Sequence, residues 1–278
     1  MPITVKELKC TYNAGLPTEI TALDGVSLRA ERGEIISIVG QTGSGKSTLA
    51  QHLNALIVPQ SGEVIVDGLN PAERSENLRR IREKVGLVFQ YPEQQIFSET
   101  VEDELSFGPI NWGVDKSEIH DRVISAMSVM GLREDILKKN PFALSGGQKR
   151  RVAIASILAS KPDYIVLDEP TAGLDASGTE ELIEVLKVSA KNGVGVVHIT
   201  HDLELALTIS DKILILEHGK SISWGTPEET ARALCFGKPD SLALPDVLML
   251  SKILYEAGKI SGVEWEPYRL AEMVARGC

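Results

Sequence analysis

Cysteine, aromatic residues and long apolar runs are all scarce in this sequence of 278 residues. The three cysteines, Cys10, Cys235 and Cys278, do not have the spacing of a metal site or a redox pair. No signal peptide precedes Ile3, so we expect the chain to work in a reducing cytosol. No apolar run approaches the roughly 18 residues that span a bilayer, so any membrane role must come from a partner chain.

Basic residues are also in deficit, because 29 Lys and Arg face 39 Asp and Glu, which gives a net charge of −10. An acidic surface disfavours binding to phosphate backbones, whose affinity comes mainly from Lys and Arg, so we expect no nucleic-acid partner. The length and a hydrophobic content of 43% are sufficient for one large domain with a small appendage.

The hydrophobic pattern alternates between short β-branched runs and helical periods. The runs predict strands at Ile3–Cys10, Gly25–Ala30, Ile35–Val39, Glu63–Val66, Val85–Phe89, Tyr164–Leu167, Val194–Thr200, Lys212–Glu217 and Ser221–Trp224. The periods predict helices at Lys46–Leu56, Glu76–Glu83, Val101–Phe107, Ser117–Met130, Gly146–Ala159, Thr179–Lys191, Leu203–Ile209, Glu228–Leu234 and Asp246–Ala257. This alternation predicts an α/β fold with a central, mostly parallel sheet.

Two departures from the alternation predict how the chain is organised. The early strands have no helices between them, which indicates a small antiparallel β layer at the front. From Val101 to Ala159 the pattern is almost wholly helical, which predicts a helical subdomain at about 91–160 inserted into the sheet order. Gly237, Pro239 and Pro245 interrupt the pattern near the end. We therefore expect a main domain at 1–225 and a helical appendage at 226–278.

A glycine-rich stretch, "GQTGSGKST", lies between a predicted strand and a predicted helix and fits G-x-x-x-x-G-K-[ST]. Such a loop lets backbone N–H groups converge on phosphate oxygens, and the helix N-terminus adds partial positive charge. The lysine reaches the β and γ phosphates, and the serine hydroxyl can ligate Mg²⁺. The predicted nucleotide-binding residues are Gly40, Gln41, Gly43, Ser44, Gly45, Lys46, Ser47 and Thr48.

Two carboxylates end the apolar run "YIVLDEP", which has the composition of a central buried strand. Asp168 suits an Mg²⁺ ligand acting through water, and Glu169 can orient and deprotonate a water aimed at the γ-phosphate. Alone, the pair would be a polar loop after a strand. The phosphate-binding loop on the same chain favours the catalytic interpretation.

A second glycine-rich stretch, "LSGGQKR", precedes another predicted helix. Ser145, Gly146 and Gly147 stand at its N-cap, where a hydroxyl, backbone amides and the helix dipole make a second anion site. One nucleotide needs only one such site, so the second requires an explanation.

The ordered set "GQTGSGKST", Gln90, "LSGGQKR", "YIVLDEP", "AGLD" and "ITHD" resembles the ATPases of ABC transporters over roughly residues 1–225. The resemblance implies an ABC-type P-loop NTPase fold that hydrolyses ATP with Mg²⁺. It also implies that two such domains pack head to tail and that each LSGGQ stretch covers the γ-phosphate held by the other domain. The residues acting in trans would be Ser145, Gly146, Gly147 and Gln148, with Asp175 at the seam.

The same resemblance assigns roles to three residues that carry no signal alone. His201 would contact the γ-phosphate and the attacking water, although an isolated histidine here is more often a helix cap or a surface residue. Gln90 would contact Mg²⁺ and water. Tyr12 would stack on adenine, although by itself it is an ordinary strand tyrosine.

An acidic, amphipathic stretch runs from Gln90 to Pro109, "QYPEQQIFSETVEDELSFGP", with five carboxylates among apolar residues. Thr100 with Asp103 predicts a helix cap. A solvated acidic helix is the simplest interpretation. However, "YPEQQIFSETVEDELSFGPINWG", "TYNAGLPTEITALDGVSL" and "ALPDVLMLSKILYEAGK" resemble the ATPases of energy-coupling factor (ECF) transporters. That resemblance implies a groove for a helix of a membrane subunit, with docking residues Glu93, Ile96, Phe97, Glu99 and Glu102.

The resemblance to ECF ATPases implies uptake of vitamins or transition-metal ions at the cytoplasmic face of the cell membrane. The implied partners are a second ATPase, either a related chain or a second copy, a transmembrane scaffold subunit and a substrate-binding membrane subunit. The appendage either braces the dimer or only caps the fold. The alternatives are the ATPase of another ABC transporter class, a DNA-maintenance ATPase, a translation factor with two cassettes, and a nucleotide-gated module without turnover.

Overall fold

Two β-sheets form the centre of the computed structural model, which describes residues 1–237 and 242–276. Pro239 and Cys278 lie outside the described residues. The smaller, antiparallel sheet has the order β2-β1-β4, with β1 at Ile3–Tyr12, β2 at Ile20–Ala30 and β4 at Ser61–Val66. The larger sheet has the order β5-β6-β7-β3-β8-β9 and is parallel except for β9. Its strands are β5 (Val85–Val88), β6 (Tyr164–Asp168), β7 (Gly195–Thr200), β3 (Ile35–Val39), β8 (Lys212–Glu217) and β9 (Lys220–Gly225).

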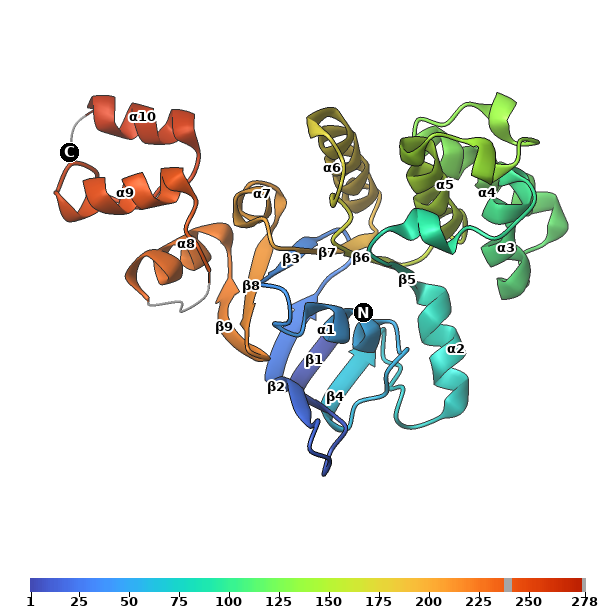
Figure 1. The fold of residues 1–278 in the computed structure, drawn as a ribbon, viewed down its shortest axis with the longest axis horizontal. Coiled ribbons are helices and arrows are strands. Elements are labelled where there is room, and N and C mark those ends of the chain that lie inside the picture. Colours follow the sequence, from blue (N-terminus) through green and yellow to red (C-terminus); the bar gives the residue numbers. More distant parts are fainter. Residues whose placement is uncertain (238–241, 277–278) are drawn as a thin grey trace.

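The helices gather in three places around these sheets (Figure 1). A helical group beside β5 consists of α3 (Val101–Trp112), α4 (Lys116–Val129) and α5 (Gly146–Ala159), with short 3₁₀ turns at Pro92–Gln95, Glu134–Ile136 and Pro141–Ala143. Nearer the sheets lie α1 (Lys46–Leu53), α2 (Ser75–Lys84), α6 (Ala176–Lys191) and α7 (Leu203–Ile209). At the opposite end of the molecule lie α8 (Pro227–Phe236), α9 (Asp246–Glu256) and α10 (Pro267–Arg276).

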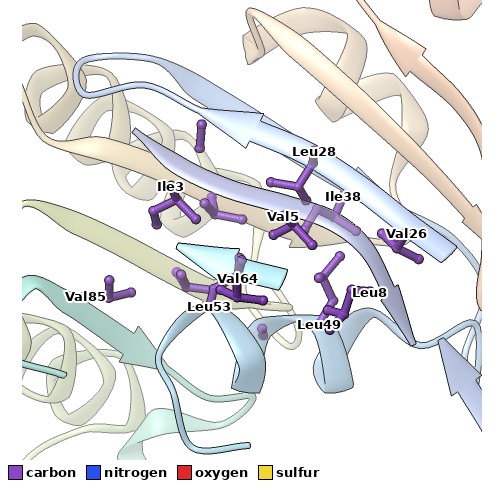
Figure 2. Packing of buried hydrophobic residues seen from close by; sticks show 14 of the residues in the cluster. Ile3, Val5, Leu8, Val26, Leu28, Ile38, Leu49, Leu53, Val64 and Val85 are labelled. Atoms are coloured by element: carbon purple, nitrogen blue, oxygen red, sulfur yellow. The ribbon is translucent and has the colours of Figure 1, made fainter. Parts of the chain in front are cut away.

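The main core fills the space between the two sheets and α1. Figure 2 shows Leu49 and Leu53 of α1 pointing toward Leu8 and Val64 of the antiparallel sheet, within one buried cluster. A second buried cluster joins the other face of the large sheet to α5 and α6, and a third joins it to α7 and α8. Helices on both faces explain why β3 and β6 are buried along their whole length.

The predicted elements are confirmed, with differences at their ends. Helix α1 stops at Leu53, because Ala55 adopts a left-handed backbone conformation with φ 55°. Helix α6 begins at Ala176 because the Asp175 side chain accepts a hydrogen bond from the Gly178 N–H and caps it. Helix α3 continues through Pro109 to Trp112.

Helix α10 was not predicted from the sequence. Within the described part of the chain, Leu270 is the one residue of this helix that is buried.

The order of the central strands determines where functional residues meet. Because β6, β7 and β3 are adjacent and parallel, their carboxyl ends lie at one edge of the sheet. Val39, Asp168 and Thr200 end these strands. Ligands of open parallel sheets bind at this edge.

Candidate functional site

The loop from Gly40 to Gly45 connects the end of β3 to the start of α1. Gly45 is the N-cap of α1 and has φ 105°, a conformation that L side chains rarely adopt. A Cβ atom at Gly45 would collide with the Ala22 carbonyl, and one at Gly40 with the Leu216 carbonyl. The glycines therefore allow the loop to pass close to neighbouring backbone.

Lys46 begins α1 and carries a buried ammonium group. Its Nζ donates hydrogen bonds to the carbonyl oxygens of Gly40, at 2.7 Å, and Gln41, at 3.0 Å. It also lies 3.8 Å from Oε1 of Glu169. Burial lowers the pKa of Lys46, and the charges of Glu169 and Asp168 act against that shift. The loop thus encloses a cation next to the two predicted acids.

Asp168 and Glu169 have different surroundings. Burial raises the pKa of Asp168, while a hydrogen bond with Ser47 acts in the opposite direction. Glu169 follows it in a left-handed conformation with φ 49°, and its N–H donates to the Ile199 carbonyl at 2.9 Å. The Nδ1 atom of His201 lies 2.8 Å from Oε2 of Glu169. The structure therefore brings together the residues predicted to bind magnesium and to activate water.

Tyr12 lies at the open side of the same cleft. Its hydroxyl is 3.3 Å from Oγ1 of Thr48, and its ring is partly exposed. The cleft has a volume of about 290 Å³. Its lining includes the predicted residues Tyr12, Gly43, Gly45, Lys46, Ser47, Thr48, Gln90, Asp168 and Glu169, and also Ile20, Ala22 and Thr42.

The cleft fits a nucleotide phosphate with a divalent cation. Ser44 Oγ is buried in the loop and has no hydrogen-bond partner within the described part of the chain. In the same described residues, no group of three His, Cys, Asp or Glu side chains could hold a metal by itself. Mg²⁺ typically takes one or two protein ligands together with phosphate oxygens, so a hydroxyl at Ser47 beside the Asp168 carboxylate suits it.

The second glycine-rich stretch lies elsewhere. Ser145 caps α5, with its Oγ accepting from the Gln148 N–H at 3.3 Å, and Gln148 Oε1 accepts from the Ser145 N–H in return. Ser145, Gly146 and Gly147 are exposed, and none of them lines the nucleotide cleft. Asp175 is also exposed at the start of α6. Within one chain, the structure does not bring the two glycine-rich sites together.

The predicted docking segment borders a separate groove of about 410 Å³. Phe97 is 60% exposed there and meets Phe107 edge to face, with ring centroids 4.8 Å apart. Ile96 is buried beneath this surface and Glu99 is exposed. The predicted cap is present, because Thr100 accepts a hydrogen bond from the N–H of Asp103.

Two of the acidic docking residues have partners within the chain. Both carboxylate oxygens of Glu93 accept from Arg150, at 3.1 and 3.2 Å. Glu102 forms an ion pair with Lys138. A partner's cation would have to compete with these bonds, which the sequence does not reveal.

Two buried charged residues that contact the docking segment were not predicted from the sequence. Arg150 stands in "LSGGQKR" but had no assigned role. Glu104 is buried in α3, and its Oε2 accepts from the backbone N–H groups of Phe97, at 3.2 Å, and Ser98, at 3.0 Å. The sequence does hold a signal for Glu104, because this charged residue falls on the apolar side of the predicted helix.

Comparison with known proteins agrees with this geometry. The family model described as "ABC transporter" matches residues 23–172, more than half of the chain. The energy-coupling factor transporter ATP-binding protein EcfA2 of Clostridioides difficile is 42% identical over 261 residues, which cover 93% of this chain and 91% of the relative. EcfA2 of Streptococcus sanguinis is 42% identical over 260 residues, which cover 93% of each chain.

Two solved structures resemble this chain in fold and, to about one third, in sequence. CbiO1 from Clostridium perfringens, described as part of the ABC transporter complex CbiONQ, has a TM-score of 0.75 and 35% identity, covering 89% of this chain and 97% of that chain. The ATP-binding cassette MJ0796, solved as a dimer in a post-hydrolysis state with ADP and Pi, has a TM-score of 0.72 and 32% identity, covering 81% and 98%. The resemblance and the fold class predicted from the motifs are confirmed. The chain therefore belongs to the ABC transporter ATPases and, among them, to the ATP-binding proteins of energy-coupling factor transporters.

Proposed function

We propose that ATP hydrolysis takes place in the cleft at the carboxyl ends of β3, β6 and β7. The loop Gly40–Thr48 holds the β and γ phosphates, and Lys46 balances their charge. Glu169 orients and deprotonates the attacking water, and His201 holds Glu169 and the water in place. The observation that carries this proposal is the 2.8 Å contact between His201 and Glu169, beside the buried ammonium of Lys46.

Mg²⁺ would be held by Ser47 and Gln90 and, through water, by Asp168, and it would neutralise charge on the phosphates. Tyr12 would stack on the adenine ring, since its exposed ring borders the cleft.

The second anion site supports a working dimer. Ser145, Gly146, Gly147 and Gln148 lie outside the cleft of their own chain, so we assign them to the γ-phosphate held by a second ATPase. Asp175 would lie at the seam. The second ATPase is either a related chain or another copy of this one. The dimeric form of a solved relative supports this arrangement. Residues 1–225 would form the ATP-binding domain, with the helical subdomain at about 91–160, and 226–278 would brace the dimer or cap the fold.

The closing of this dimer would drive import through membrane partners. The described residues include no helix with the length and hydrophobicity of a membrane span. A transmembrane scaffold would supply the path, and a separate membrane subunit would bind the cargo. The cargo would be a vitamin or a transition-metal ion. The chain would act as a peripheral protein at the cytoplasmic face of the cell membrane. The docking surface would be the groove that Phe97 and Phe107 line. Glu93, Ile96, Glu99 and Glu102 would contribute from the same stretch of the chain, although they do not line the groove.

The docking proposal is tested best at Phe97, because a charge change at Glu93 would also disturb Arg150. Phe97→Asp should leave ATP binding unchanged and should reduce recovery of the membrane subunits and cargo uptake. Ile110→Asp is the matched control, since Ile110 is 58% exposed on α3 but does not line the groove. Full recovery and normal uptake with Phe97→Asp would remove the docking surface from the account.

A further inference from the structure

Arg150 is buried at the start of the second turn of α5, and its guanidinium bonds to two other segments of the chain. Nε and Nη2 donate to the two carboxylate oxygens of Glu93, at 3.1 and 3.2 Å. Nη1 donates to the Ala172 carbonyl at 2.6 Å and lies 3.5 Å from the Pro170 carbonyl. A bidentate contact with a carboxylate is among the stronger and more directional side-chain interactions.

The two carbonyls belong to the loop that follows Glu169. The Ala172 N–H donates to the Glu169 carbonyl at 3.1 Å, while its own carbonyl accepts from Arg150. Glu169 has φ 49°, which is unfavourable for a residue with a side chain and persists only where surrounding contacts hold it. Arg150 therefore supports the turn that keeps Glu169 in this conformation.

The carboxylate partner belongs to the groove segment, Tyr91–Gln95. Glu93 lies in the 3₁₀ turn whose Pro92 and Gln95 line the groove. The guanidinium carbon of Arg150 lies 6.0 Å from the centre of the Tyr91 ring. Burial alone would raise the pKa of Glu93, but the hydrogen bonds from Arg150 hold it below its ordinary value. The contact with Arg150 thus favours the charged form of Glu93.

We propose that Arg150 is a positioning residue that links the groove segment to the backbone holding Glu169. The proposal rests on the proposed roles of Glu169 as the general base and of the groove as the docking surface. An occupant that shifts Tyr91–Gln95 moves Glu93, and through Arg150 this moves the Ala172 carbonyl and the Glu169 turn. A lysine at this position is a point charge and does not reproduce the planar fork.

The test measures kcat and ATP affinity of the purified chain, with the melting temperature as a check of folding. Arg150→Lys should lower kcat by roughly ten- to one-hundredfold, because a small displacement of a reacting group has effects of this size, while the Kd for ATP is unchanged. Arg151→Lys is the matched control, because its partly exposed side chain pairs with the exposed Glu181 at 3.2 Å. The control should keep kcat within roughly twofold.

A double-mutant cycle distinguishes a specific path from Glu93 through Arg150 to Glu169 from a general effect of Arg150 on the stability of the fold. Glu93→Gln keeps the bonds between Arg150 and the carbonyls and should also lower kcat. The double variant should be no slower than Arg150→Lys alone, because both changes break one path. Losses that multiply, or a normal kcat for Arg150→Lys, would overturn the proposal.

If Arg150→Lys does not fold, Glu93→Gln decides alone, because a lower kcat supports the link and an unchanged kcat overturns it. Failure of the proposed general base gives a different result, namely that Glu169→Gln hydrolyses ATP at the normal rate while Arg150 is intact.

Discussion

The two glycine-rich stretches of this chain share one chemical plan but differ in what holds them. In the phosphate loop, Gly40 and Gly45 press against the backbone carbonyls of Leu216 and Ala22, so the fold itself requires glycine. In the second stretch, a Cβ atom at Gly146 or Gly147 would meet no atom within 4 Å. Packing within the described part of this chain therefore leaves room for a larger residue at both positions. This room is consistent with our proposal that a second ATPase approaches this helix end from outside.

The surrounding charges show the same contrast. Lys46 is buried, donates to the carbonyls of Gly40 and Gln41, and lies beside Glu169. Ser145 and Gln148 are bonded to each other at the exposed start of α5. The phosphate-loop half of the site is therefore held by contacts within the chain. We propose that the other half is presented to a second ATPase.

The largest effect on kcat is expected in the phosphate loop. Lys46→Met removes the cation that faces the β and γ phosphates and should lower kcat by roughly a hundredfold to a thousandfold. Phosphate release by the purified protein measures this, and circular dichroism checks that the variant is folded. A kcat near the normal value would show that the enclosed ammonium is not part of the phosphate site.

The second prediction concerns the half that is presented outward. Gly147→Asp should fold normally, since its side chain meets open space, and should lower kcat on the order of a hundredfold by placing a negative charge against the γ-phosphate. Mixing Gly147→Asp with Lys46→Met should restore activity, because one of the two shared sites then has both halves intact. Two inactive variants that stay inactive when mixed would contradict a working dimer made of two copies of this chain.

The sequence was sufficient to predict the part of the site in which the residues lie in or next to the strands of the parallel sheet. Asp168 ends β6 and Glu169 follows it, so the pattern of parallel strands was sufficient to predict that both lie near the phosphate loop. The role of His201, which follows β7, came only from the family resemblance. The pair Arg150–Glu93 could not be predicted, since its partners are 57 positions apart and no periodicity links them. Helix α10 was missed although its apolar residues Leu270, Met273 and Val274 recur at helical spacing. Only packing reveals contacts of this kind.

A smaller effect is expected at the adenine end of the cleft. Tyr12→Ala should weaken ATP binding by roughly tenfold, the usual loss when an aromatic side chain under a base is removed. Tyr12→Phe keeps the ring, loses only the 3.3 Å contact with Thr48, and should bind almost normally. Fluorescent nucleotide titration compares the two variants. Equal weakening by both would assign the effect to the hydroxyl and remove the stacking role.

A separate prediction concerns the stability of the sheet that supports the phosphate loop and not the rate of ATP hydrolysis. His198 is buried in β7 beside Ser37, and burial lowers its pKa from 6.5 to about 4. The unfolded chain takes up a proton below pH 6.5 and the folded chain does not, so this contribution to stability is complete above pH 6.5 and is lost as the pH falls toward 4.

Urea unfolding at a series of pH values measures this dependence. His198→Val should flatten it over that window, whereas His120→Gln, at an exposed position on α4, should not. An identical pH dependence in wild type and His198→Val would show that His198 does not cause it.

The central claim is that ATP joins two ATPases by completing the outward-facing half of each site. Sedimentation of purified Glu169→Gln with and without ATP and Mg²⁺ tests it directly, because turnover is blocked while the contacts remain. The account predicts a monomer without nucleotide and a dimer with it, and a monomer under both conditions when Gly147→Asp is added. A Glu169→Gln protein with the same sedimentation coefficient in both conditions, alone and with its natural companion ATPase, would contradict it.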